Sequence, residues 1–158
     1  MLKYLFKKTN YLVSNKITKV KFPISADAKK IAAKILEKDS HKERQILGDE
    51  LLDELADLAK IDIVKLKISE ERQQHKKRAG RLVFKRYGYY KPGEKYIHIN
   101  NRIAVRGQIL ASKTFLDTLL HEWMHHYDFC KLGLHSIHTA GFYKRLGDLK
   151  MKLDWPRC

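Results

Sequence analysis

A chain of 158 residues with 44% hydrophobic side chains is long enough for one folded domain and too short for two comfortable ones. Its 33 Lys and Arg against 18 Asp and Glu give a formal net charge of +15. That excess indicates a polyanionic partner, nucleic acid ahead of an anionic membrane surface, although a basic protein with no such partner is the alternative.

The two cysteines, Cys130 and Cys158, do not make a disulfide framework, which favours a reducing compartment. Residues 1–13 have neither the uninterrupted apolar region nor the small-residue cleavage site of a signal peptide. No stretch approaches the length of a membrane span. We therefore expect a cytoplasmic protein without a membrane partner, and the oligomeric state is open.

Residues 1–25 carry six lysines and no acid, and we expect them to form a basic N-terminal arm ahead of a single domain over residues 26–158. The arm is either a flexible extension or, from the alternation in residues 17–22, an edge strand. Ser25 predicts the N-cap of a first helix. Apolar residues at helical spacing predict a second helix over residues 46–59.

Further along, the apolar period changes from helical to two, which predicts three strands, over residues 61–68, 81–87 and 95–100. Pro92-Gly93 is a turn signal, so the last two strands are expected to form an antiparallel hairpin. A final helix is predicted from about Thr139. The expected fold is α+β, with N-terminal helices, a small antiparallel sheet, a motif helix and a C-terminal helix.

The motif helix contains His121-Glu122-Trp123-Met124-His125. Positions i and i+4 of a helix share one face, so both imidazoles can reach one metal ion, while Glu122 projects beside that ion without being a ligand. Thr114 followed by Asp117 predicts a capping box at the start of this helix, and Gly133 predicts its stop. The alternative is a helix with exposed histidines, which leaves its polar groups unexplained on an apolar element.

Zinc in a hydrolase takes three protein ligands and leaves one position for water. The metzincin spacing would need a histidine where Lys131 stands, and no glutamate follows the motif. His126 points away from its neighbouring motif histidine and is expected at the surface or behind the ligands. His138, just ahead of the last helix, is the favoured third ligand, and His135 is the alternative.

The motif, twelve intervening residues and then His138-x-x-x-Phe142-x-Lys144 resemble the SprT-like metalloprotease family, which includes the Spartan proteases. The expected order of elements is similar to the compact zincin-like domain of that family. Two features depart from it: Thr139 stands where the family usually has Gly, and the chain lacks the cysteines for a C-terminal four-cysteine zinc ribbon. The resemblance implies a zinc metalloprotease with a DNA-associated role, acting on DNA-bound or DNA-crosslinked proteins.

For that chemistry we expect one zinc ion on three neutral imidazoles, with Glu122 taking a proton from the attacking water and passing it to the leaving amine. Asp117 and Asp128 are candidates to orient the imidazoles, although capping and surface roles compete. An oxyanion donor is expected, without a ranking, among Tyr127, His135, Tyr143 and Arg145.

A basic surface is expected within residues 72–106, which hold eleven Lys or Arg and one acid. Basic side chains neutralise phosphates and aromatic rings stack on bases, so the pattern indicates single-stranded nucleic acid. The candidate contact residues are Lys76, Lys77, Arg78, Arg81, Lys85, Arg86, Tyr87 and Tyr89. Alternatively, the aromatic rings face the core.

Two other functions stay open. One is a nucleic-acid-binding module whose structural zinc has a fourth protein ligand, and the other is a zinc peptidase unrelated to DNA.

Overall fold

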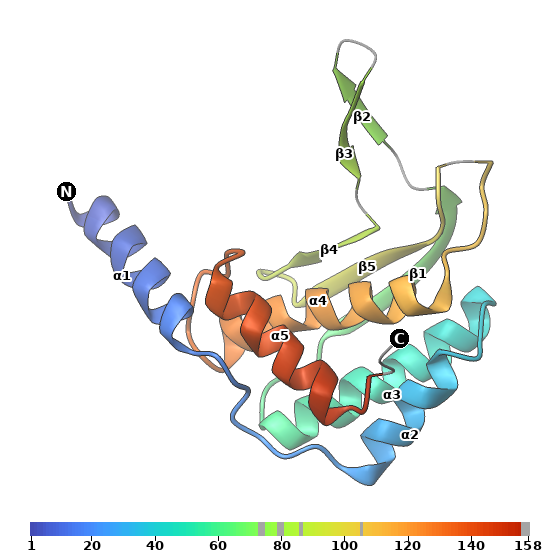
Figure 1. Ribbon diagram of the computed structural model, residues 1–158, viewed down its shortest axis with the longest axis horizontal. Coiled ribbons are helices and arrows are strands. Elements are labelled where there is room, and N and C mark those ends of the chain that lie inside the picture. Colours follow the sequence, from blue (N-terminus) through green and yellow to red (C-terminus); the bar gives the residue numbers. More distant parts are fainter. Residues whose placement is uncertain (73–74, 79–80, 86, 105, 156–158) are drawn as a thin grey trace.

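The computed structural model describes residues 1–72, 75–78, 81–85, 87–104 and 106–155, and from residue 72 to residue 85 it describes the backbone alone. The described residues form five helices and five strands (Figure 1): α1 (Leu2–Lys16), α2 (Ala26–Ile35), α3 (His41–Ala59), β1 (Lys65–Arg72), β2 (His75–Arg78), β3 (Arg81–Lys85), β4 (Gly88–Lys91), β5 (Tyr96–Arg102), α4 (Ser112–Cys130) and α5 (Ala140–Lys152). The predicted α+β class is confirmed. None of the described helices is long and apolar enough to cross a membrane.

The main sheet is mixed, whereas the sequence predicted an antiparallel one. Its strand order is β1-β5-β4, and the central strand β5 runs parallel to β1 and antiparallel to β4. Strands β2, β3 and β4 lie between β1 and β5 in the chain. The apolar pattern of a strand does not depend on whether its neighbour runs parallel or antiparallel to it. A parallel pairing therefore could not be read from strand periodicity.

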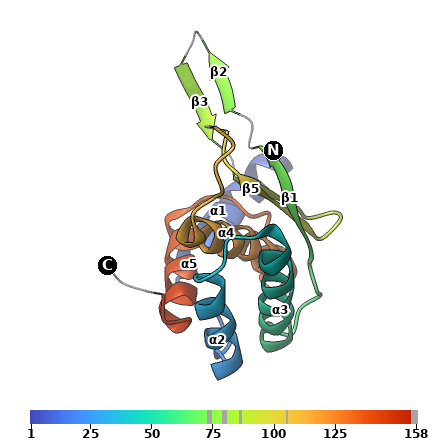
Figure 2. The ribbon, with the colours of Figure 1, turned by 90° about the vertical axis from the view of Figure 1, so that its right-hand side faces the viewer.

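The predicted hairpin exists, but its first strand is β4 and not residues 81–87. β4 pairs with β5 across the turn at residues 92–95. Residues 81–85 form β3, which pairs with β2 in a separate two-stranded hairpin. This second hairpin projects away from the rest of the molecule in both views (Figures 1 and 2).

Helix α4 lies at the centre of the domain. It packs against β4 and β5 on one side and against α2, α3 and α5 on the others (Figures 1 and 2). Most of its apolar side chains are buried, with Phe129 as an exposed exception, and they pack against core residues of the sheet and of the other helices. Among the largest buried side chains are Trp123, Tyr127 and Phe115 of α4, Phe142 of α5, Ile97 and Ile99 of β5, and Leu51 and Leu55 of α3.

The predicted cap of the first core helix is confirmed, since the Ser25 hydroxyl accepts a hydrogen bond from the Ala28 amide at the start of α2. The capping box predicted for the motif helix is wrong. Helix α4 begins two residues earlier, at Ser112, and Thr114 already lies inside it, where its carbonyl accepts the Thr118 hydroxyl. Asp117 does not cap; it forms an ion pair with Lys150 of α5.

The N-terminal arm is neither a flexible extension nor an edge strand, because residues 2–16 form α1. The alternation that suggested a strand in residues 17–22 has another cause. The side chains of Val20 and Phe22 are buried in the core. The backbone amides in this segment bond to side chains and not to another strand: the Val20 amide donates to the Asp148 carboxylate and the Lys21 amide to the Tyr127 hydroxyl. The domain boundary at residue 25 stays a prediction.

Candidate metal centre

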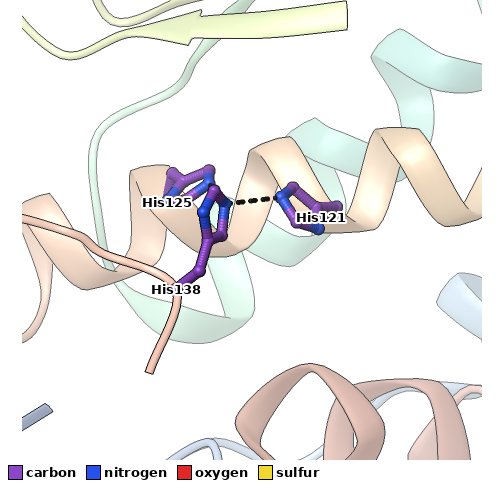
Figure 3. Close-up of side chains that lie close together, drawn as sticks. All are labelled: His121, His125 and His138. Carbon is purple, nitrogen blue, oxygen red and sulfur yellow. Dashed lines mark hydrogen bonds between the residues drawn. The ribbon is translucent and has the colours of Figure 1, made fainter. Parts of the chain in front are cut away.

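Two segments of the chain bring three imidazoles together. Helix α4 places His121 and His125 one turn apart on the same face, and the loop that leads into α5 brings His138 over them (Figure 3). The Nε2 atom of His138 lies 3.0 Å from Nε2 of His121 and 3.1 Å from Nε2 of His125. The predicted trio is therefore assembled, with one ring nitrogen of each residue pointing at a common centre.

The geometry fits a small metal ion. One ligand atom from each histidine lies within 4.8 Å of the others. With zinc–nitrogen bonds of about 2.0–2.1 Å, tetrahedral ligand atoms lie about 3.3 Å apart, only slightly more than the two nitrogen distances here. Within the described part of the chain, no other His, Cys or carboxylate joins this cluster. The three histidines can thus hold a metal ion.

The imidazoles of His121 and His125 are held in the neutral form that metal binding requires. Burial, together with the neighbouring histidines, lowers the pKa of His121 to about 4 and that of His125 to about 3. A protonated ring in this place would lose hydration and meet two other rings. Lone pairs are consequently available at neutral pH.

A buried chain of polar groups orients His125. Its Nδ1 atom lies 2.8 Å from the Ser136 hydroxyl, which donates in turn to Asp128 at 2.8 Å. Because the hydroxyl proton is used on the carboxylate, the Ser136 oxygen accepts from Nδ1–H, and this leaves the Nε2 lone pair for a metal ion. Asp128 therefore acts through Ser136, a residue that the sequence analysis missed. Its only sequence signal was a polar residue two positions before His138.

Asp128 is held by a bidentate ion pair. Arg145 Nε and Nη2 donate to its two oxygens at 3.0 and 2.7 Å, and both side chains are fully buried. Burial raises the pKa of the Asp128 carboxyl, whereas Arg145 and the Ser136 hydroxyl favour its charged form. The remaining Arg145 donors bind the carbonyls of Ser14 and Ile17. Through Ser136, Asp128 and Arg145, the loop ahead of α5 is thus connected to the C-terminal end of α1.

Aromatic rings of α5 pack on the histidine cluster. Phe142 stacks on His125 at a centroid distance of 4.6 Å, and Tyr143 stacks on His138 at 5.9 Å. The ring of Phe142 also meets His138 edge-on. Phe142 of α5 therefore packs on both His125 and His138.

The cluster opens into a cleft of about 600 Å³ between α4 and strand β4. Glu122 lines this cleft together with the three histidines. His135, the alternative third ligand, also lines it but is not part of the ligand cluster. Its backbone is fixed instead by Asn10, whose amide oxygen accepts from the His135 N–H and whose amide nitrogen donates to the His135 carbonyl.

The expectation that His126 lies at the surface or behind the ligands is corrected. It is fully buried and takes no part in the metal cluster. Its Nδ1 lies 2.7 Å from the Tyr90 hydroxyl and its Nε2 lies 2.7 Å from the Asp62 carbonyl. It therefore joins α4 to β4 and to the segment ahead of β1. The sequence could not predict this role, because it depends on where the sheet lies relative to α4.

Two of the four candidate oxyanion donors lie away from the cleft. The Tyr127 hydroxyl accepts the Lys21 amide, and Arg145 is engaged with Asp128, and neither residue lines the cleft. His135 lines the cleft and Tyr143 packs beside His138. Asp117 also lines the cleft but is paired with a lysine.

The predicted nucleic-acid residues divide into two groups. Tyr87 and Tyr89 line the cleft, and Tyr89 stacks on His98 with ring centroids 5.1 Å apart. The remaining predictions lie outside the residues whose side chains are described: Lys76, Lys77, Arg78, Arg81, Lys85 and Arg86.

Comparison of the chain with family models, with curated proteins and with solved structures finds no match.

Proposed function

We propose that this protein is a zinc-dependent metallopeptidase of the SprT-like kind that uses Glu122 as its general base. The observation that carries the proposal is the convergence of three histidine Nε2 atoms on the wall of a cleft that Glu122 also lines. Three protein ligands without a fourth in the described residues leave a coordination position for water, as catalytic zinc sites do.

The residues then have separate roles. A zinc ion bound by His121, His125 and His138 would supply Lewis-acid chemistry, polarising a carbonyl and lowering the pKa of a water molecule. Glu122 accepts the proton of the attacking water and returns it to the leaving amine. Ser136 keeps His125 in the tautomer that presents Nε2.

The cleft also suits an extended chain. Among the described strands, β4 is at an edge of the main sheet; its residues Gly88, Tyr89 and Tyr90 line the cleft, as does Tyr87 just before it. An edge strand can take up an extended peptide as an additional strand, with its main chain held by backbone hydrogen bonds. A peptide so placed would cross the face of α4 that carries the histidines, which supports a protein substrate.

We further propose that the substrates are proteins bound or crosslinked to DNA, and that single-stranded DNA is the preferred nucleic acid. The net charge of +15 supports a polyanionic partner. Strands β2 and β3, whose sequences are rich in Lys and Arg, form a hairpin that projects from the domain (Figure 1).

The test is proteolysis of a basic DNA-binding protein by zinc-loaded chain, with and without single-stranded DNA. Glu122→Gln should abolish cleavage and keep stoichiometric zinc, because the amide cannot accept the proton but the histidines are intact. Glu50→Gln, an exposed position on α3, is the matched control and should cleave like wild type. An active Glu122→Gln protein would disprove the general-base role.

The two other functions give different results in the same experiment. Cleavage that DNA does not stimulate, with weak dependence on salt, identifies a zinc peptidase unrelated to DNA. Tight zinc binding with a closed four-ligand shell, DNA binding and no cleavage of any protein identifies a nucleic-acid-binding module with a structural zinc.

A further inference from the structure

Helix α1 leaves most of its length outside the packed domain. Residues 1–9 are all exposed, and the helix extends away from the body with the N-terminus at its tip (Figure 1). Its apolar side chains are among the most exposed of the described residues: Leu2 is 85% exposed, Phe6 63% and Leu5 53%. An exposed run of this kind marks an interaction surface.

The polarity of α1 is the reverse of that of an ordinary surface helix. It meets the domain through polar side chains: Asn10 binds the His135 backbone and Ser14 binds Thr139 and Arg145. At about 100° per residue, Leu5 and Leu12 lie roughly opposite those two docked residues. A surface helix normally turns its apolar stripe to the core and its polar side to water. Here the apolar stripe faces out.

Such a helix needs a partner for its stability. An isolated helix shorter than about 12 residues is marginal in water, because few hydrogen bonds offset the cost of nucleation. Residues 1–9 are all exposed and therefore gain little from packing within the described domain. A surface that buried the apolar stripe would supply the missing stabilisation.

The charge of α1 indicates the chemistry of that surface. The helix carries Lys3, Lys7, Lys8 and Lys16 and no acidic residue. The partner must therefore offer apolar depth and negative charge together, which is what an anionic bilayer presents at its headgroup boundary.

A second copy of the chain meets only half of this requirement. The groove between α2 and α3 is acidic, with residues such as Glu50, Asp53 and Asp57, but Ile31 is its only large apolar residue. It would accept the lysines and leave Leu5 and Phe6 in water. The lipid surface satisfies both features.

We propose that α1 is an amphipathic anchor that lies on an anionic lipid surface through Leu5 and Leu12 at the centre of its apolar side and Leu2 and Phe6 at the margin of that side, with its lysines at the headgroups. The expectation of no membrane partner rested on the absence of an apolar stretch long enough to span a bilayer, a condition that interfacial helices do not need to meet. The anchor is independent of the proposed peptidase activity.

The test is flotation of the zinc-loaded chain of residues 1–158 with vesicles of phosphatidylcholine, with or without phosphatidylglycerol. Wild type should float with the anionic vesicles only, and less so at high salt. Leu5→Glu with Phe6→Glu should reduce binding at least about ten-fold, because it places two charges in the buried stripe. Ile46→Glu with Ile63→Glu changes two apolar residues of similar exposure outside α1 and should bind like wild type.

Three results would overturn the anchor. One is no flotation with anionic vesicles. Another is equal loss of binding in both double variants, which would make net charge the sole cause. The third is a concentration-dependent oligomer in sedimentation that Leu5→Glu with Phe6→Glu dissolves without any lipid binding by wild type. Zinc content and peptide cleavage should be the same in all three proteins, so failure of the anchor is distinguishable from failure of the peptidase.

Discussion

At the scale of single residues, the Arg145–Asp128 pair joins the metal site to the rest of the domain. Asp128 lies on α4, Arg145 lies on α5, and the guanidinium also binds two carbonyls at the end of α1. Every polar atom of this fully buried pair has a partner in the described residues. Such a pair adds little net stability by itself, but breaking it leaves one buried charge without compensation.

Arg145→Met is therefore expected to lower the free energy of unfolding by about 3–5 kcal/mol, because Asp128 would remain charged in an apolar setting. Urea denaturation followed by circular dichroism measures the change. Arg102→Met removes an arginine from an exposed pair with Glu70 and should cost no more than about 1 kcal/mol. Equal losses in the two variants would contradict the structural role of Arg145.

Ser136 is the residue through which the buried pair acts on the site. Ser136→Ala removes the acceptor for His125 Nδ1 and keeps the Arg145 pair, so the fold should be retained while zinc affinity falls about 10-fold. Competition with a chromophoric chelator measures the affinity. Ser112→Ala, at the start of α4 and not lining the cleft, is the control. Unchanged affinity in the Ser136 variant would mean that His125 needs no orientation.

At the scale of elements, helix α5 fits against the end of α1 through a glycine. A Cβ atom at Gly141 would lie 2.2 Å from the Ser14 carbonyl oxygen, so the two backbones meet where a side chain would stand. Thr139 caps the same helix, accepting from the Phe142 amide, and its hydroxyl lies 2.9 Å from that of Ser14. The start of α5 and the end of α1 therefore form one joint next to His138.

Gly141→Ala should lower the free energy of unfolding by about 1–3 kcal/mol, since the backbone contact leaves no room for the methyl group. Gly147→Ala, in the same helix with open space around it, should raise that free energy by up to about 1 kcal/mol through helix propensity. Thermal unfolding of the two variants separates steric from conformational effects. A stabilised Gly141→Ala protein would show that the joint is looser than its distances indicate.

At the scale of the whole molecule, the metal site couples distant parts of the chain. Its ligands come from α4 and from the loop ahead of α5, and Asn10 of α1 holds that loop at His135. The unfolded chain cannot hold the three Nε2 atoms together, so a metal ion that binds the cluster binds the folded state alone. Metal binding is then linked to folding.

Zinc at about one hundred times its dissociation constant should raise the free energy of unfolding by about 2.7 kcal/mol. Differential scanning fluorimetry should show a rise in melting temperature that a chelator reverses and that Mg²⁺ does not produce, since imidazole ligands suit zinc better. His138→Ala changes an exposed ligand, so the variant should fold and lose the shift. If the His138→Ala variant showed the full rise in melting temperature, zinc would bind outside the cluster of three histidines.

The sequence by itself determined the α+β class, the helix α2 with its Ser25 cap, and the three histidines that meet in the structure. These features depend on local spacing: helical periodicity, a cap and an i, i+4 pair are written into neighbouring residues.

Only the tertiary structure decided the parallel pairing of β1 with β5, the burial of His126, the path from His125 through Ser136 and Asp128 to Arg145, and the outward apolar stripe of α1. Each of these depends on which groups meet across long stretches of chain. Local periodicity is the same for either strand direction and for either side of a helix, so the distant contact, and not the local pattern, sets the outcome.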